Sequence, residues 1–150
     1  MAGYGTNCPT THVFTQNSGA IPQGLDFPVP PAGQICVCDW INFSANATVA
    51  VGQIVAGIRE ADGTHTMYSE VSNKAAAIGD VLSLRITFDN GFPIFFPNFN
   101  SGTPGTLCAT TQDTGQLEAY CDDIGTTATI INFAVGYHYE PISWRSHDRI

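Results

Sequence analysis

Charge is scarce in this sequence, and positive charge is the scarcest. Only 12% of the 150 residues are charged, about half the usual share of a soluble domain. Thirteen acids against five bases give a formal net charge of −8. Nucleic acids are bound by clustered Lys and Arg, whereas the five basic residues here are scattered along the chain. The composition therefore argues against a nucleic-acid partner.

Long apolar runs are also missing. No stretch approaches the roughly 18 apolar residues of a membrane span, so we expect no membrane partner. The opening residues, MAGYGTNCPTTHVF, lack the basic and apolar regions of a secretory signal. Yet little Lys and much Thr, Gly and Asn are typical of an extracellular protein. A virion protein made in the host cytoplasm fits both observations, and so does a mature secreted protein with an added Met.

Motifs for catalysis and for cofactor binding do not occur. The chain has no G-x-S-x-G, no glycine-rich phosphate loop and no C-x₂₋₄-C zinc pair, which are the spacings that those chemistries use. Carboxylates for glycoside hydrolysis could in principle be drawn from Glu118, Asp122, Asp123 or Glu140. Asp122-Asp123 is more simply a loop before the last strand. We expect a protein that is not an enzyme and that needs no cofactor or metal.

The five cysteines are an odd number, so at least one stays unpaired or pairs between chains. Cys36 and Cys38 share one face if they lie in a strand, an arrangement that does not favour a disulfide. Cys108 and Cys121 would close a short loop and are the pair that we favour for a disulfide. The alternative is that most of the cysteines are small buried hydrophobic residues.

Strand signals dominate the rest of the chain. About eight to ten short segments rich in Val, Ile, Thr and aromatics are separated by turn residues. The clearest is 80–88, DVLSLRITF, which alternates apolar and polar side chains. The stretch 70–80 holds at most one helical turn. The pattern predicts an all-β fold, an antiparallel β-sandwich of the jelly-roll or immunoglobulin-like type.

Strict alternation along these strands assigns the core. The expected core residues are Val49, Val51, Val55, Leu82, Leu84, Ile86, Ile131, Phe133 and Val135. In the strand around 34–43 the same rule places Ile35, Val37, Ile41 and Phe43 on one face, with Asp39 interrupting. Hairpin turns are expected at Asp62-Gly63 and Asp89-Asn90-Gly91. Pro93 and Pro97 should confine the following segment to a sheet edge.

The two ends of the chain differ from its middle in composition. Residues 1–31 are rich in Gly, Pro, Asn and Thr, and we expect an extended N-terminal arm that packs along a neighbouring subunit or shell. Residues 32–141 form the β-sandwich domain, and residues 142–150 form a polar C-terminal tail.

Some aromatic residues lie in the arm, the Pro-rich edge and the tail rather than on clean core-facing strands. These candidates for a protein interface are Phe14, Phe27, Phe95, Phe96 and Trp144. Exposed aromatics anchor protein interfaces or stack on sugars. The alternative is that they close one end of the sandwich core.

Three segments carry a family resemblance. Residues 28–58, PVPPAGQICVCDWINFSANATVAVGQIVAGI, resemble the opening of small virion proteins of tailed bacteriophages. That opening has an extended lead-in, Pro-Ala-Gly, a strand ending near Asn, a small polar turn and a Val-rich strand. Residues 127–140, TATIINFAVGYHYE, are similar to the final strand of such domains. Residues 80–96 lie where these domains carry their central hairpin.

The family is that of capsid decoration (cement) proteins and related head and tail accessory proteins. The resemblance implies a structural virion protein that binds and stabilises the outer surface of the assembled phage head. Its partners would be the major capsid protein and neighbouring copies of itself, as a homo-oligomer. The alternative function is a carbohydrate- or receptor-binding β-sandwich module of a phage tail or of a secreted lectin-like protein.

Overall fold

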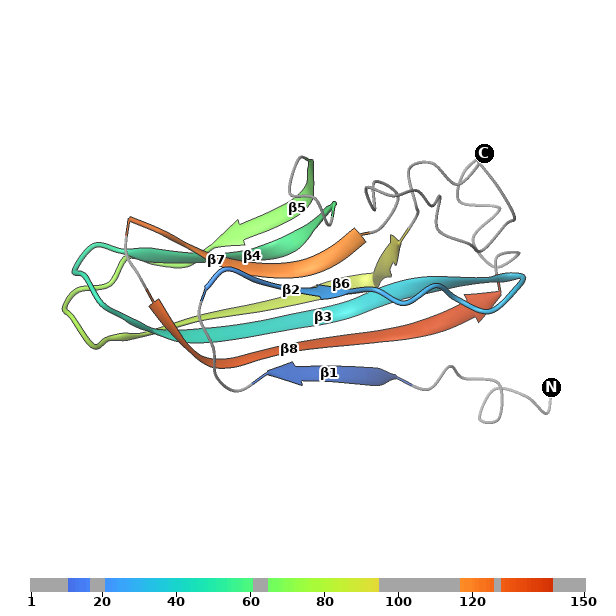
Figure 1. Cartoon of the computed structure of the whole chain (residues 1–150), viewed down its shortest axis with the longest axis horizontal. Helices are drawn as coiled ribbons and strands as arrows, with labels where there is room; N and C mark the ends of the chain where they lie inside the picture. Colours follow the sequence, from blue (N-terminus) through green and yellow to red (C-terminus); the bar gives the residue numbers. More distant parts are fainter. Residues whose placement is uncertain (1–10, 17–20, 61–64, 95–116, 126–127, 142–150) are drawn as a thin grey trace.

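The computed structural model describes residues 11–16, 21–60, 65–94, 117–125 and 128–141. They form eight strands: β1 (His12–Gln16), β2 (Gln23–Asp26), β3 (Gln34–Ala47), β4 (Gln53–Glu60), β5 (Thr66–Val71), β6 (Val81–Ile94), β7 (Leu117–Ile124) and β8 (Ala128–Pro141). Sheet A has the order β1-β8-β3-β6 and sheet B the order β2-β7-β4-β5, and the two sheets form two layers (Figure 1). The prediction of an all-β antiparallel sandwich is confirmed. None of the described residues belongs to a helix long and apolar enough to cross a membrane.

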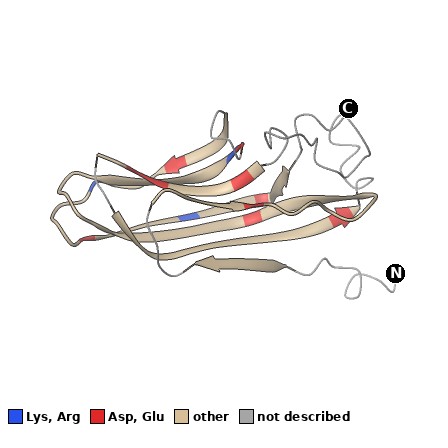
Figure 2. Ribbon diagram, viewed as in Figure 1, with Lys and Arg blue, Asp and Glu red and all other residues tan. Residues whose placement is uncertain are grey.

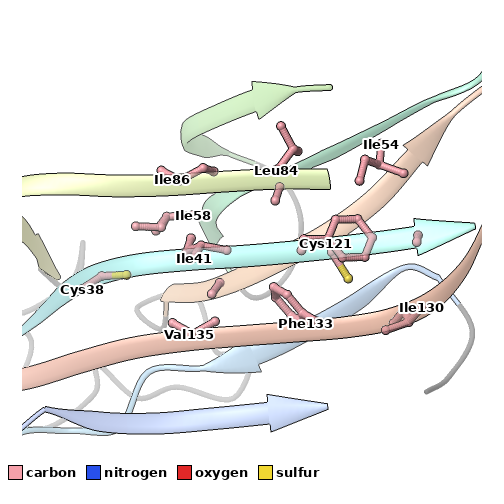
Figure 3. Packing of buried hydrophobic residues seen from close by; sticks show 14 of the residues in the cluster. Cys38, Ile41, Ile54, Ile58, Leu84, Ile86, Cys121, Ile130, Phe133 and Val135 are labelled. Carbon is pink, nitrogen blue, oxygen red and sulfur yellow. The ribbon is translucent and has the colours of Figure 1, made fainter. Parts of the chain in front are cut away.

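The core lies between the two sheets (Figure 3). Sheet A contributes Phe43 and Phe133, whose ring centroids lie 5.8 Å apart at 73°, an edge-on arrangement that aromatic pairs favour. Sheet B contributes Ile54 and Ile58, both fully buried. The predicted inward positions on β6, Leu82, Leu84 and Ile86, are confirmed as buried. Alternation was therefore a reliable guide in the regular part of β6.

A β-bulge changes the faces of β3. The register with both neighbouring strands shifts between Cys38 and Trp40, so Asp39 adds a residue and the alternation changes phase there. Before the bulge Cys36 and Cys38 point into the core, and after it Ile41 and Phe43 do. The prediction that placed Ile35 and Val37 on the same face as Ile41 is therefore wrong. Both are buried, but on the outer side of sheet A.

Four other predicted core positions are also wrong or only partly buried. Val49 and Val51 lie in the loop between β3 and β4 and are exposed, and Val55 is half-buried because Ile54, Ala56 and Ile58 face the core instead. On β8 a register shift opposite Ser44 and Ala45 turns Ile130 inward. Ile131 is consequently exposed, while Phe133 and Val135 are buried as predicted.

The chain does not reverse at Asp89-Asn90-Gly91. Asn90 and Gly91 do adopt positive φ angles of 62° and 76°, which is the backbone conformation that a tight turn needs. However, β6 continues to Ile94, and pairing moves from Thr87 opposite Trp40 directly to Phe92 opposite Cys38. The turn residues thus make an outward bulge within one strand. Pro93 lies in β6, an edge strand of sheet A, as predicted.

The described part of the expected N-terminal arm lies within the sandwich. β1 pairs with β8 at the edge of sheet A, and β2 pairs with β7 at the edge of sheet B. The Phe27 backbone N–H donates to the Leu117 carbonyl at 3.0 Å. The structure therefore differs from the expectation of a segment that packs only on a neighbour. Residues 1–10, 17–20 and 142–150 lie outside the described residues.

Candidate functional site

Exposed apolar side chains gather at one end of the sandwich. Two loops meet there, 48–52 between β3 and β4 and 72–80 between β5 and β6 (Figure 1, left). We call these loops, with the adjoining residues Val81 and Ile124, the loop end. The exposed fractions are 44% for Val49, 68% for Val51, 73% for Ile78, 60% for Val81 and 45% for Ile124. These five are half of the ten large exposed hydrophobic residues in the described part of the chain, so the patch is not a random scatter.

The two loops are held together by backbone hydrogen bonds. The Val51 N–H donates to the Ala75 carbonyl at 2.8 Å, and the Ala75 N–H donates to the Gly52 carbonyl at 2.9 Å. The Gly79 N–H donates to the Ala47 carbonyl at 2.8 Å. Because Ala75 is also buried in the core, the loops form a fixed platform on the sandwich.

Val51 is held in an unfavourable backbone conformation. Its φ angle is 63°, in the left-handed region, where a β-branched residue is a clear outlier. The hydrogen bond from its N–H to Ala75 fixes this conformation. Such strain persists only when the surroundings enforce it, and it concentrates at functional sites. The result of the strain is a valine side chain that points into solvent.

The acids near the loop end are engaged by the backbone. Asp80 Oδ2 accepts hydrogen bonds from the N–H groups of Ala76 and Ala77, at 2.8 and 2.9 Å. Asp123 Oδ2 accepts one from the Ala128 N–H at 2.9 Å. The two loops carry no other charged residue except Lys74. The chemistry that this end offers to a partner is therefore mainly apolar.

Only two of the five predicted interface aromatics fall among the described residues. Phe27 is fully buried and meets the Tyr137 ring edge-on, with centroids 6.4 Å apart, so it serves the core. Phe14 is half-buried on β1 and stacks on Tyr137 at 5.0 Å. Neither lies at the loop end. Phe95, Phe96 and Trp144 lie outside the described residues.

The described cysteines are buried thiols. Cys36, Cys38 and Cys121 are free, and all three point into the core between the sheets. Burial raises the pKa of Cys36 and of Cys121 to about 12, and it raises the pKa of Cys38 further still. Cys108, the predicted partner of Cys121, lies outside the described residues, so that pairing stays a prediction.

A histidine bridges two carboxylates on the outer side of sheet A. His138 Nδ1 lies 2.7 Å from Asp39 Oδ2, and His138 Nε2 lies 3.0 Å from Glu140 Oε2. Burial lowers the pKa of His138, but the hydrogen bonds and charges of Asp39 and Glu140 outweigh it, so the pKa is raised. The bulge at Asp39 brings this carboxylate to the ring. The cluster is a stabilising charge network of the sandwich.

A second charged cluster lies on the outer side of sheet B. Arg59 Nε donates to Glu118 Oε1 at 2.8 Å, and the Arg59 guanidinium lies 4.4 Å from the Tyr120 ring centroid. Burial raises the pKa of Glu118, Arg59 lowers it and Asp26 raises it, with a net rise. A side chain at Gly24 would collide with the Glu118 carboxylate. The absence of a side chain at Gly24 therefore leaves space for the Glu118 carboxylate.

In the described part of the chain, no group of three or more His, Cys, Asp or Glu side chains could hold a metal ion. No protein-family model matches the chain, and a search of curated proteins found no significant match.

Proposed function

We propose that the chain is a structural, non-enzymatic virion component: a capsid decoration protein that holds the outer surface of an assembled phage head by its loop end. The observation that carries the proposal is the loop end itself. It is an exposed apolar patch, fixed by hydrogen bonds, with backbone strain at Val51. Exposed apolar side chains that cluster, rather than lie scattered singly, mark interaction sites on soluble proteins.

We further propose that the sandwich is a jelly roll. The first strand pairs with the last, β2 with β7, β3 with β6 and β4 with β5. Such nested pairing is the pattern obtained by rolling up one long antiparallel hairpin. Jelly rolls include viral capsid domains, and also lectins and cupins. The fold type therefore supports a virion protein only by analogy, and the loop end supplies the more specific support.

A small apolar patch suits a protein that works in many copies. A symmetric shell presents the same site repeatedly, so moderate contacts per subunit add up if copies are linked by the homo-oligomer that we also propose. The net charge of −8 keeps free subunits soluble and apart. Apolar contacts change little with salt, so we expect binding to be only weakly salt-dependent.

Cosedimentation with assembled heads tests the proposal. The full chain is mixed with heads built from the major capsid protein of the same genome and pelleted. We expect saturable binding that the double variant Val51→Ser/Ile78→Ser weakens at least ten-fold. The matched control is Val13→Ser, which changes a valine exposed to 54% on β1, opposite Gly136 and away from the loop end.

Two results would overturn the proposal. The first is a folded chain that does not pellet with heads at all. The second is binding that the loop-end variant leaves unchanged. Mass spectrometry of purified particles adds an independent criterion, because a decoration protein must occur in a copy number comparable with that of the capsid protein.

A further inference from the structure

Beyond the cluster of Asp39, His138 and Glu140, the outer face of sheet A carries a row of polar side chains of which only Arg85 is charged. Ile41, Phe43 and Ala45 point into the core, so Trp40, Asn42 and Ser44 on the same strand point outward. By the same alternation, Ser83 and Arg85 of β6 and Asn132 of β8 point outward. Arg85 is the only Lys or Arg on the four strands of sheet A, where charged residues are few (Figure 2).

These side chains converge because the strands are in register. Asn42 pairs with Arg85, and Ser44 lies between Ser83 on one side and Asn132 on the other. Together they line a depression of about 120 Å³. Within the described residues, none of these five side chains has a hydrogen-bond or ion-pair partner in the protein. As far as the described residues are concerned, their donors and acceptors are available to a ligand.

Trp40 lies next to this depression. Its indole packs over Gly136 of β8 and fills the space that a side chain at position 136 would need. Trp40 and Asn42 are two residues apart on one strand face, or about 6.7 Å. The indole is half-buried, supported from below by the glycine backbone. An aromatic ring fixed in this way beside amide and hydroxyl groups offers both stacking and hydrogen bonding.

The chemistry of the row selects one class of ligand. Asn and Ser side chains are both donors and acceptors, while Arg only donates. A ligand with closely spaced hydroxyl groups meets both requirements. The charge of −8 opposes polyanions, and Arg85 within the depression opposes cations. A neutral sugar satisfies all of these conditions, with its ring face against an aromatic side chain.

We propose that the outer face of sheet A binds a neutral saccharide, which stacks on Trp40 while Asn42, Arg85 and Asn132 hold its hydroxyl groups. This site is separate from the loop end, and the inference does not depend on the proposed function. It uses residues other than Phe95 and Phe96, which the sequence singled out as protein-interface candidates and for which sugar stacking was the other use considered.

The test begins with the full chain on an array of neutral oligosaccharides, including cellohexaose, maltohexaose, mannohexaose and chitohexaose. The best binder is then titrated by calorimetry and by tryptophan fluorescence. The variant Trp144→Phe leaves Trp40 as the only tryptophan, so a fluorescence change in that variant reports on the proposed site. We expect binding with a change in the Trp40 signal.

Substitutions then locate the site. Asn42→Ala and Arg85→Ala should each weaken binding about ten-fold, because each removes hydrogen bonds to the sugar. Trp40→Phe keeps an aromatic ring and should weaken binding by a smaller factor. The matched control is Ser69→Ala, which changes an exposed residue of β5 in sheet B, and it should bind normally. The loop-end variant Val51→Ser/Ile78→Ser should also bind normally.

Three outcomes would overturn the inference. The first is that no oligosaccharide on the array binds at millimolar concentration. The second is that Asn42→Ala and Arg85→Ala bind as well as the unchanged chain. The third is that analytical ultracentrifugation shows self-association that both substitutions abolish, in which case this face joins copies of the chain. None of these outcomes bears on binding of heads by the loop end, so the two proposals fail separately.

Discussion

Valine and isoleucine have opposite roles in the two parts of this molecule. In the body of the sandwich, Ile41, Ile54 and Ile58 are fully buried between the sheets, whereas at the loop end Val51 and Ile78 are 68% and 73% exposed. The residue types are the same, so apolar character alone does not decide their positions. What differs is the backbone, because sheets turn alternate side chains inward and the paired loops do not.

The backbone hydrogen bonds at the loop end show why its side chains stay outside. The N–H groups of Val51 and Ala75 are bonded across the two loops, and that of Gly79 is bonded to Ala47 at the end of β3. Turning Val51 inward would break such bonds, and an unpaired buried polar group costs about 1–3 kcal/mol. The small residue Ala75 already fills the core position at this end. The apolar side chains above it therefore remain available to a partner.

The largest expected contrast is between two isoleucines given the same substitution. Ile58→Ala should lower the free energy of unfolding by about 2–5 kcal/mol, because it leaves a cavity in a closed core. Ile78→Ala should change it by less than about 0.5 kcal/mol, because the side chain has few neighbours to lose. Urea unfolding followed by circular dichroism measures both. Equal losses would contradict the division into body and loop end.

This contrast marks how far the sequence alone could predict the fold. The strands and the antiparallel sandwich follow from alternation and turn residues, and β6 shows this with Leu82, Leu84 and Ile86. Bulges limit the method. One added residue at Asp39 reverses the faces of β3. In the sequence Asp39 is only a polar interruption of an apolar face, which does not by itself show that a residue is inserted. The turn signal at Asn90-Gly91 predicted the local φ angles but not that the strand continues.

The candidate site was beyond the reach of sequence patterns. Val49 and Val51 alternate with small residues like a strand, so they were placed in the core. Both are exposed in the structure, where this segment is hydrogen-bonded to a loop about 25 residues later through Ala75 and Gly79, a pairing that alternation cannot reveal. Likewise, Ser44 and Asn132 meet on sheet A because β3 pairs with β8, a contact between distant parts of the chain.

The next largest effect concerns the strain at Val51. Val51→Gly should raise the free energy of unfolding by roughly 0.5–1 kcal/mol, because glycine adopts a positive φ without steric cost while an L-residue pays for it. The same variant loses an exposed apolar side chain, so binding to heads should weaken. Increased stability with decreased binding would identify the strain as a functional feature.

Val49→Gly is the matched control for that experiment. Val49 is exposed to 44% but does not have a positive φ angle. Glycine there should destabilise the protein slightly, through the entropy of the unfolded chain. If Val51→Gly is no more stable than Val49→Gly, the left-handed conformation of Val51 is not a source of strain.

The body also differs from the loop end in being sensitive to pH through His138. Its pKa is raised in the folded state by Asp39 and Glu140, against the effect of burial, so folding favours the protonated ring. This contribution is fully present below the unfolded pKa of about 6.5 and is lost as pH rises through the folded value. Thermal unfolding between about pH 5 and pH 9 should show stability falling over that window.

His138→Gln removes the titrating group and should flatten this part of the pH profile. Because glutamine still offers a donor to one carboxylate, the variant should fold. Ile78→Ala is the control at the loop end and should keep the pH profile of the unchanged chain. A profile for His138→Gln that still falls over the same window would assign the pH dependence to other groups.

Thiol labelling probes the boundary between body and loop end directly. The variant that it uses, Ile78→Cys, should have the smallest effect on stability. The thiols of Cys36 and Cys121 are buried and have pKa values of about 12, so at pH 8 they are both inaccessible and protonated. Since the thiolate is the reactive form, they should react only as fast as the sandwich opens. Ile78→Cys places a thiol at the exposed loop end and should react at the rate of a free cysteine.

Peptide mapping by mass spectrometry after brief exposure to iodoacetamide assigns each modified site, and it separates Cys8 and Cys108 from the others. The unchanged chain serves as the control, because position 78 is then unreactive while the body thiols are the same. Fast labelling of Cys36 or Cys121 in the folded chain would mean that the body is not closed. Slow labelling in Ile78→Cys would mean that the loop end is covered in solution, by a second copy or by residues outside those described.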